Sequence, residues 1–505
     1  METPLILPVV NPNSQMIAPQ QLRDEYQFDA LITNSYLIWR KHREDKNLPK
    51  IHDLLKFNGV IHTDSGAYQI LQYGDVEVQP REIIEFQERI DTDVAVILDV
   101  PTGEDCSKDH ARWTVEETIR RADLSLKIIN RSDILWVGPV QGGDYLDLVS
   151  YSAKEMAKRN FSIYALGSPV PIMQQYKFDT LVHMIMAAKP NLPSSKPLHL
   201  FGAGHPMMFA FAVALGCDIF DSASYALFAR NGRYMTAQGT AKLEELEYFP
   251  CNCAACHKKT PEEVRRLLRM DRERFLAAHN LHACHAELET IKQAIVDGRL
   301  WELVESRSRN HPTLQKAFGQ MVTYKEHLEG GSPVRKPKGP FLISEQSLNR
   351  PEVIRYQKRL LQRYSPPPNV KKILLIPEWQ IKTFRENPTQ TDPIQRLEKK
   401  TDLHICSYSL AFGIIPQELA DVYPLSQTEN SLSPNTATKD HARKCMTNYL
   451  TKFPYSKCVI VGNEEWESKA AEFLKTRFKG KMKVTYIKTQ SLTSKSVQQI
   501  VKLLK

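Results

Sequence analysis

The sequence has no long apolar segment and little low-complexity sequence. No apolar run reaches the roughly 18 to 20 residues that a membrane span needs, and the start, Met1 to Pro4, lacks the basic-then-apolar pattern of a secretory signal. No internal repeat is seen beyond an alternation of strands and helices, and no low-complexity tract lies outside residues 331–368. These absences exclude an integral membrane protein and predict a cytoplasmic one.

The composition is that of a folded chain with a modest basic excess. Its 505 residues are 42% hydrophobic and 25% charged, which predicts two or three domains, one of them large. Lys and Arg number 67 against 58 for Asp and Glu, so the formal charge is +9. Such an excess favours a polyanionic partner without identifying it, and alone it is more often a solubility feature.

Cysteine is scarce and unevenly placed. Of nine cysteines, three crowd into the segment Cys251-Asn252-Cys253-Ala254-Ala255-Cys256. In a reducing compartment such crowding favours metal ligation over disulfides, whereas unligated thiols are the competing interpretation. Three thiolates leave a tetrahedral zinc ion one ligand short, and His279 and His282 on the helix expected downstream are the nearest candidates for the fourth. A closed Cys₃His site has no position for water, so one structural zinc ion per chain is predicted.

From about residue 25 to 240 short apolar runs alternate with helical stretches. This is the pattern of βα units and a parallel sheet. The runs are 59–62, 94–98, 134–137, 162–166, 198–201 and 218–220, and the clearest helices between them are Pro80 to Ile90 and Thr114 to Asn130. The residues that follow these runs are polar or Gly, namely Asp64, Asp99, Gln141, Gly167, Gly202 with His205, and Asp221.

Six such positions favour a closed (β/α)₈ barrel, that is, a TIM barrel, because the chemistry of that fold gathers at the carboxyl ends of its strands. An open doubly wound sheet would place ligands at strand ends only near its switch point. The predicted organisation has four parts. They are a barrel core at 1–240, a zinc-binding helical subdomain at 241–330, a linker at 331–368, and a small α/β domain at 369–505.

Two carboxylates are candidates for covalent chemistry. Asp64 precedes a Gly-containing turn, and Asp221 ends a second run. Two carboxylates that converge on a barrel mouth can exchange a glycosidic bond with retention, one as nucleophile on the sugar carbon and one as proton carrier. Taken singly, each Asp is better explained as a helix N-cap, so the convergence carries the prediction.

Other residues suit a purine nucleotide. Asp99 and Gln141 match the donor and acceptor pattern of a purine edge, and Tyr68 could stack on its face. Arg230 and Arg233 flank a short loop that could hold phosphates of an extruded nucleotide. A lysine-rich stretch, 475–488, could likewise contact phosphates, although a solvated surface explains it equally well.

At this point a family resemblance is specific. The sequence resembles tRNA-guanine transglycosylases over roughly residues 3 to 330, with the motifs in the order found in that family. They are Asp64-Ser65-Gly66-Ala67-Tyr68-Gln69, Asp99-Val100-Pro101-Thr102, Val140-Gln141-Gly142-Gly143, Ala165-Leu166-Gly167, Phe220-Asp221-Ser222, Arg230-Asn231-Gly232-Arg233, and the Cys-x-Cys-x₂-Cys cluster with His279. Two segments, 8–13 and 278–281, are similar to the archaeal branch.

The resemblance implies a TIM barrel with a zinc subdomain. It also implies an activity in which a D-loop guanine of tRNA, expected at position 15, is replaced by 7-cyano-7-deazaguanine on the route to archaeosine. Asp221 would be the nucleophile on ribose C1′, and Asp64 the general acid/base. Ser65, Tyr68, Asp99, Gln141 and Gly167 would bind the base, while Cys251, Cys253, Cys256 and His279 would hold zinc. Family precedent also suggests a homodimer.

The C-terminal part resembles a domain that archaeal transglycosylases share with archaeosine synthases. In the synthases a Pro-Cys, followed by Lys-Pro-Tyr, marks the amidine-forming site after the first strand. Here that strand runs into Pro377-Glu378-Trp379 without a cysteine, so amidine synthesis is not expected. The family's RNA-binding PUA domain is not seen, which suggests a separate PUA-domain protein as a partner. The competing hypothesis is a non-catalytic tRNA-binding paralogue or a synthase-like subunit.

Overall fold

A computed structural model describes residues 2–45, 47–67, 78–378, 380, 397 and 402–504. The chain divides into two compact units, residues 1–324 and 325–505. Each unit has its own sheet and its own buried core.

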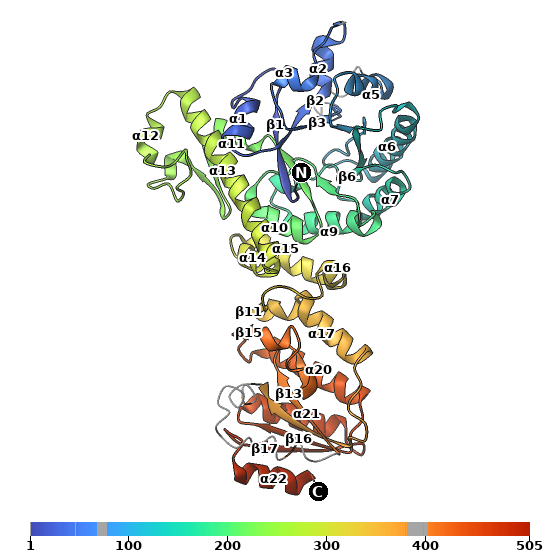
Figure 1. Ribbon diagram of the computed structural model, residues 1–505, viewed down its shortest axis with the longest axis vertical. Helices are drawn as coiled ribbons and strands as arrows, with labels where there is room; N and C mark the ends of the chain where they lie inside the picture. Colours follow the sequence, from blue (N-terminus) through green and yellow to red (C-terminus); the bar gives the residue numbers. More distant parts are fainter. Residues whose placement is uncertain are drawn as a thin grey trace. The chain divides into compact units, whose positions relative to one another are not determined.

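The first unit is a closed barrel of eight parallel strands, as predicted (Figure 1). In order these are β1 (Leu5–Val10), β2 (Ala30–Asn34), β3 (Val60–Asp64), β4 (Val94–Val96), β5 (Leu135–Val140), β6 (Ile163–Leu166), β7 (Leu198–Leu200) and β8 (Ile219–Ser222). Closure comes from β1, which pairs with β8 on one side and β2 on the other. The six predicted runs correspond to β3 through β8. The first two strands were not predicted.

Alternate residues of the strands fill the barrel with apolar side chains. The pairs Ala30 and Ile32, Val94 and Val96, and Ile163 and Ala165 all belong to one buried cluster. Their spacing of two is the strand period, which sends every second side chain to the same face. These side chains form the apolar core of the barrel.

Helices surround the barrel. They are α1 (Pro19–Asp24), α2 (Ser35–His42), α3 (Ile51–Leu55), α5 (Pro80–Arg89), α6 (Lys108–Ile128), α7 (Leu146–Ala157), α8 (Val170–Gln174), α9 (Phe178–Ala188), α10 (Pro206–Ala214) and α11 (Ser224–Arg230). Two helices beyond the barrel, α14 (Leu300–Ser308) and α15 (Pro312–Met321), pack against α10 and α9.

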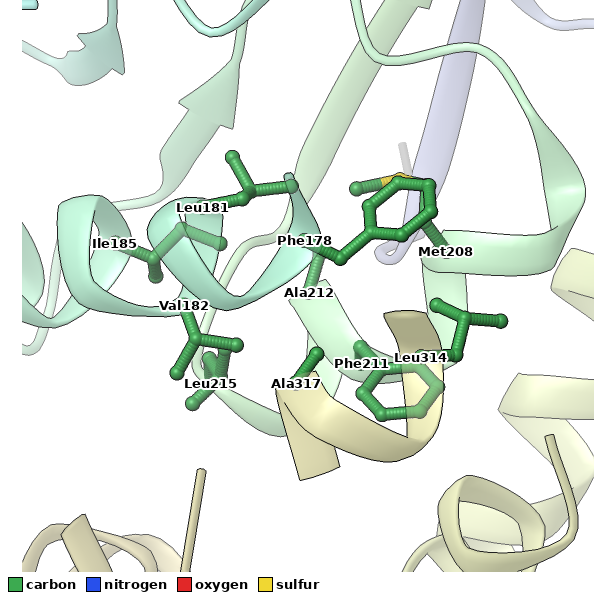
Figure 2. A pocket seen from close by; sticks show the side chains of 10 residues that line it. All are labelled: Phe178, Leu181, Val182, Ile185, Met208, Phe211, Ala212, Leu215, Leu314 and Ala317. Atoms are coloured by element: carbon green, nitrogen blue, oxygen red, sulfur yellow. The ribbon is translucent and has the colours of Figure 1, made fainter. Parts of the chain in front are cut away.

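The seam between α9, α10 and α15 is apolar (Figure 2). Phe178, Phe211 and Leu314 are among the side chains that line a gap of about 10 Å³ there. A gap of this size barely admits one water molecule, and its walls offer no polar partner for one. This seam is helix packing and not a binding site.

A small subdomain follows β8. It consists of the hairpin β9 (Arg233–Thr236) and β10 (Gly239–Lys242), a cysteine-bearing loop, α12 (Pro261–Arg265) and the long helix α13 (Arg269–Val296). Thr260 and Glu263 form a capping box that starts α12. Helix α13 packs against α11 and the hairpin, so it ties the subdomain to the barrel.

The second unit is a three-layer α/β domain. Its five-stranded sheet has the order β14 (Gly413–Pro416), β13 (Leu403–Ser409), β12 (Lys372–Pro377), β16 (Lys457–Gly462) and β17 (Lys483–Lys488), and only β14 runs antiparallel to its neighbour. One face is covered by α17 (Pro351–Gln362), α20 (Thr436–Lys452) and α21 (Glu465–Arg477), and the other by α22 (Ser494–Leu504). A helix α16 (Lys325–Gly331) and a short pair, β11 (Phe341–Leu342) with β15 (Glu429–Asn430), complete it.

The segment 331–368, expected to be a linker, contains α17 and β11. Val353 and Leu360 of α17 are buried in two apolar clusters of the second unit. In the structure this segment therefore belongs to that unit.

Candidate active site and metal centre

Asp64 ends β3 and is held by residues at the end of β2. Asn34 donates from Nδ2 to Asp64 Oδ2 at 3.2 Å, and Ser35 donates from its hydroxyl to the Asp64 carbonyl at 2.7 Å. Asn34 also caps α2 by accepting from Leu37 N at 2.9 Å. Because Asn34 serves both the helix and the carboxylate, the position of Asp64 is fixed by the β2–α2 turn.

Asp64 interacts electrostatically with two other carboxylates, those of Asp99 and Asp221. Burial, together with the charges of Asp99 and Asp221, raises the pKa of Asp64 to about 7, against the lowering effect of the Gly66 and Ser65 amides. Asp64 lies in β3 and Asp221 in β8, and Asp99 follows β4. Like charges that must share a buried space keep one member protonated near neutral pH.

Asp99 follows β4 and forms a pair with Gln141, which follows β5. Gln141 donates from Nε2 to Asp99 Oδ2 at 2.6 Å. The other end of its amide, Oε1, accepts from Thr102 N at 3.1 Å and from the Ser168 hydroxyl at 2.9 Å. Burial raises the pKa of Asp99 to about 6, and the Gln141 hydrogen bond opposes that rise. The pair is thus an oriented donor and acceptor edge.

Gly167, directly after β6, makes room for this pair. A Cβ atom built on Gly167 would overlap the side-chain amide of Gln141. Its own amide continues the ladder by donating to Val140 O at 2.9 Å. Glycine is therefore needed for the position of Gln141, whatever else the residue contacts.

Asp221 lies in β8 with one carboxylate oxygen occupied. Oδ1 accepts from His199 Nε2 at 2.9 Å and from the amide of Gly202 at 2.9 Å. Gly202 has a φ of +68°, a conformation that favours glycine. The Asp221 side chain is 13% exposed, and His199 is fully buried in β7. Among the described residues Oδ2 has no donor, so it is the free oxygen.

Sequence reasoning missed Asn34 and His199. His199 lies inside an apolar run, where a polar side chain reads as a satisfied core residue. The signal that could have found it is its alternation with Leu198 and Leu200, which turns it to the opposite side of the strand. A second buried histidine, His62, meets His199 edge to face at 6.3 Å between ring centroids.

The remaining predicted site residues differ in where they lie. Ser65 is buried beside Asp64, and its hydroxyl has no partner among the described residues. Arg230 ends α11 and Arg233 begins β9, and both are exposed. The Arg233 guanidinium lies 5.2 Å from the ring centroid of Phe228. Tyr68 falls outside the described residues.

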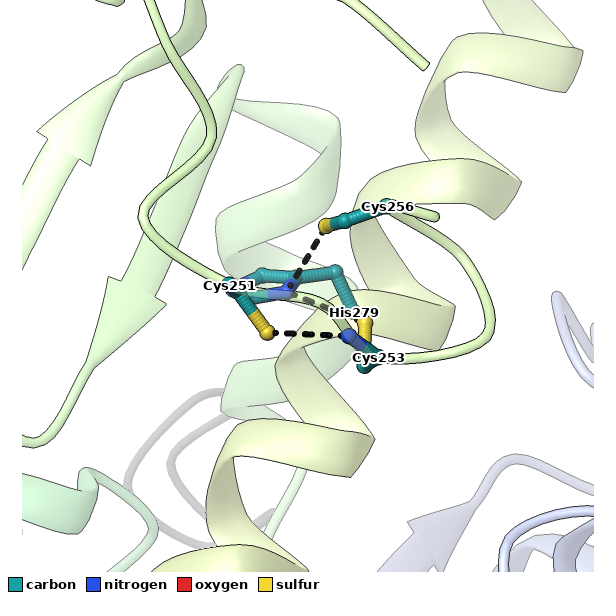
Figure 3. Close-up of side chains that lie close together, drawn as sticks. All are labelled: Cys251, Cys253, Cys256 and His279. Carbon is teal, nitrogen blue, oxygen red and sulfur yellow. Dashed lines mark hydrogen bonds between the residues drawn. The ribbon is translucent and has the colours of Figure 1, made fainter. Parts of the chain in front are cut away.

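The three clustered cysteines meet one histidine (Figure 3). Ligand atoms of Cys251, Cys253, Cys256 and His279 all lie within 4.8 Å of one another, a group that could hold a metal ion. His279 comes from α13 and the cysteines from the loop before α12, so a shared ion would join the two.

His279 is oriented for this role. Its Nε2 donates to Met235 O at 2.8 Å, which leaves Nδ1 facing the sulfurs of Cys256 at 3.4 Å and Cys253 at 3.6 Å. The ring of Tyr234 stacks on it at 3.5 Å between centroids. Hydrogen bonding from Cys256 and His279 lowers the pKa of the Cys253 thiol, which favours the thiolate that a metal needs.

The alternative histidine, His282, has another partner. Its ring packs on that of Tyr26 with centroids 5.1 Å apart. The structure therefore selects His279 from the candidates that the spacing left open.

A family model described as queuine tRNA-ribosyltransferase matches residues 1–313. The chain belongs to this family. A second model, a domain of unknown function, matches residues 353–504. The ribosyltransferase match covers the whole barrel and the metal cluster, so both sites described above lie within it. None of the helices described in this family member is long and apolar enough to cross a membrane.

Three curated relatives of the chain come from archaea. A tRNA-guanine(15) transglycosylase of Methanocaldococcus jannaschii is 45% identical over 438 residues, which is 85% of this chain and 65% of the relative. The protein of that name from Methanococcus aeolicus is 43% identical over 440 residues, with the same two shares. The one from Thermococcus kodakarensis is 45% identical over 361 residues, 71% of this chain and 62% of the relative. The chain thus spans somewhat less than two thirds of the length of these relatives.

Proposed function

We propose that this protein exchanges a guanine of tRNA, at position 15 in the D-loop, for 7-cyano-7-deazaguanine. The observation that carries the proposal is the group of Asp64, Asp99 and Asp221, which interact electrostatically at the carboxyl ends of three barrel strands. The names of the archaeal relatives support guanine 15 as the base that leaves.

Asp221 is the nucleophile in this proposal. Its free Oδ2 attacks ribose C1′, while His199 and the Gly202 amide hold Oδ1. The C1′–N9 bond breaks, a C1′–O bond to Asp221 forms, and the proton of Asp64 goes to the departing guanine. In the second half the incoming base gives its N9 proton to Asp64 and displaces Asp221. Two inversions at C1′ give overall retention.

The base is read by the Asp99–Gln141 edge. An ionised Asp99 accepts from the N–H groups of the guanine edge, and the Gln141 amide keeps that carboxylate in place. The free hydroxyl of Ser65 and the backbone at Gly167 complete the pocket. Tyr68 stacks on the base, and Arg230 and Arg233 contact phosphates outside the barrel, where both are exposed.

Zinc is the metal we propose for the Cys₃His cluster. Three sulfurs and one imidazole nitrogen match the soft donor set of structural zinc. When bound, zinc would hold the cysteine loop to α13, and it would supply no open position for water. The catalytic part would then be residues 1–240, with 241–330 as its zinc-binding subdomain.

The test is guanine exchange with a nucleophile variant. The protein is incubated with unmodified tRNA and radiolabelled guanine, and the same is done with Asp221→Ala. We expect label in tRNA with the parent chain and none with the variant. In the absence of an incoming base, a tRNA–protein adduct should appear with the parent chain alone.

Asp218→Asn is the matched control. Asp218 lies directly before β8, at the opposite end of that strand from Asp221, and pairs with Lys189. This variant should keep exchange and adduct formation. Exchange that survived Asp221→Ala would remove the nucleophile assignment. A folded parent chain that binds tRNA without exchange or adduct would identify a non-catalytic tRNA-binding protein.

A further inference from the structure

The second unit contains a cavity that the base-exchange chemistry does not use. Its volume is about 520 Å³, which lies in the range of small-molecule sites. Leu360 of α17, together with Leu419 and Leu425 from the segment after β14, gives it an apolar floor. Helix α17 supplies several of the other lining residues.

Arginines concentrate at this cavity. Arg355, Arg359 and Arg363 line it at intervals of four residues, the spacing that places side chains on one face of a helix. Arg335, from the segment before β11, lines it as well. Four guanidinium groups around one cavity form an environment for an anion with several charges.

One of these arginines is a structural anchor. Arg355 is buried, and its guanidinium donates to the Glu329 carboxylate at 2.7 Å and to the carbonyls of Pro333 and Ser332 at 2.6 Å. These bonds hold residues 329–333 against α17. Arg335 lies two residues beyond this segment, at the edge of the cavity.

The other three arginines have no carboxylate partner among the described residues. The nearby carboxylates are already occupied. Glu352 pairs with Arg350 at 2.8 Å and with Lys336 at 2.5 Å. Glu418 accepts from the hydroxyl of Tyr364 and lies 3.4 Å from His404. The positive charge of Arg335, Arg359 and Arg363 is thus left for a ligand.

Hydrogen bonds hold two tyrosines in the wall of the cavity. Tyr356 donates its hydroxyl to Ile414 O at 2.8 Å, and Tyr364 donates its hydroxyl to Glu418. Because both hydroxyl groups are hydrogen-bonded in this way, the aromatic rings are the parts of these residues that are left to contact a ligand. Aromatic walls and an apolar floor suit a flat heterocycle, to which the arginines add a place for phosphates.

We propose that this cavity binds a nucleotide, with the base against Tyr356 and Tyr364 and the phosphates on Arg335, Arg359 and Arg363. The nucleotide could be free in solution or be the phosphorylated end of an RNA, and the recognising chemistry is the same for both. This inference does not depend on the activity proposed for the barrel.

Equilibrium dialysis of the full chain tests the proposal with four radiolabelled probes. They are ATP, GTP, pyrophosphate and a 5′-phosphorylated RNA trinucleotide. A nucleotide probe should bind, and Arg359→Glu combined with Arg363→Glu should weaken it at least about tenfold, as expected for the loss of charged hydrogen bonds. Lys469→Glu, at an exposed cation on α21 that does not line the cavity, is the matched control and should bind as the parent does.

Tyr364→Leu should weaken ATP or GTP more than it weakens pyrophosphate. Binding of the trinucleotide alone would assign the nucleotide to an RNA, whereas binding of ATP or GTP would assign it to a free ligand. Three results would overturn the inference. They are failure of every nucleotide probe to bind, nucleotide binding that the double arginine variant retains, and pyrophosphate binding as tight as that of ATP and GTP. Circular dichroism of each variant establishes that the loss is not unfolding.

Discussion

At the residue scale, the central feature is that neighbouring carboxylates in the barrel have unequal pKa values. The Gln141 hydrogen bond opposes the effect of burial on the pKa of Asp99, whereas the charges of Asp99 and Asp221 add to the effect of burial on the pKa of Asp64. Groups whose environments separate their pKa values can take different roles in one reaction. The environment of Asp99 suits an anion that binds the base, and the environment of Asp64 suits a proton donor.

This difference predicts a narrow pH optimum for exchange. Asp99 must be ionised, so kcat/KM should rise with pH through about 6. Asp64 must be protonated for guanine to leave, so kcat/KM should fall as pH rises through about 7. A pH profile of single-turnover exchange checks both limbs, whose midpoints belong to the coupled group. A flat profile between pH 5 and 8 would contradict both roles.

His199 should matter through Asp221 and not through the substrate. His199→Phe removes one charged hydrogen bond to Oδ1, and kcat should fall by about tenfold to a hundredfold, which corresponds to ~1.5–3 kcal/mol. His199→Gln, which retains a donor, should recover part of that loss. The comparison variant is His62→Phe, since His62 is buried nearby and makes no hydrogen bond to any described residue. Equal losses in both phenylalanine variants would indicate a packing effect.

The residues of the candidate site that stand at or directly after the end of a strand could be predicted from the sequence. Asp64, Asp99, Gln141 and Asp221 stand after apolar runs, so strand-end reasoning found them without a structure. His199 was not predictable in this way, because a histidine inside an apolar run has the same local pattern whether it is a core residue or a partner of Asp221. Only the arrangement of β7 beside β8 brings it to the carboxylate.

At the scale of elements, strand prediction missed β1 and β2, and proline accounts for the first of these. Pro8 lies in the middle of β1 and cannot donate to the ladder, so the run 5–10 reads poorly as a strand. In the closed barrel β1 nevertheless pairs on both sides. Asn34 was missed for a related reason, because its role depends on β2 lying between β1 and β3.

The cysteine loop and α13 form an element pair that depends on metal in the proposal. Cys253→Ala should reduce bound zinc from about one ion per chain to near zero. It should also lower the melting temperature, since ligand binding to the folded state alone stabilises it. Metal analysis and thermal unfolding measure the two effects. His282→Ala, one turn along the same helix, should retain zinc, and loss of zinc in that variant would contradict the His279 assignment.

At the scale of the whole molecule, the chain carries two separate cores. The barrel core comprises residues such as Val137 and Ile163, and the second unit has clusters on both faces of its sheet. The sequence predicted an α/β domain after residue 369. The helix α17 before it was not expected, because the prolines and glycines on either side of it resemble a linker.

Two cores predict two unfolding transitions. Leu375→Ala empties a fully buried position of the second unit and should destabilise that unit by about 2–5 kcal/mol. The transition of the barrel should not move, and guanine exchange should persist at temperatures below the lowered transition. Differential scanning calorimetry of the variant checks this. A single transition that shifts as a whole would show that the units unfold together.

The pairing of β1 with β8 closes the barrel and also supports the strand that carries Asp221. Leu7 is the register neighbour of Asp221, so β1 runs alongside the strand that carries the proposed nucleophile. A purification tag attached ahead of Leu5 would therefore be joined to a strand that supports Asp221. A tag on the opposite terminus avoids that strand.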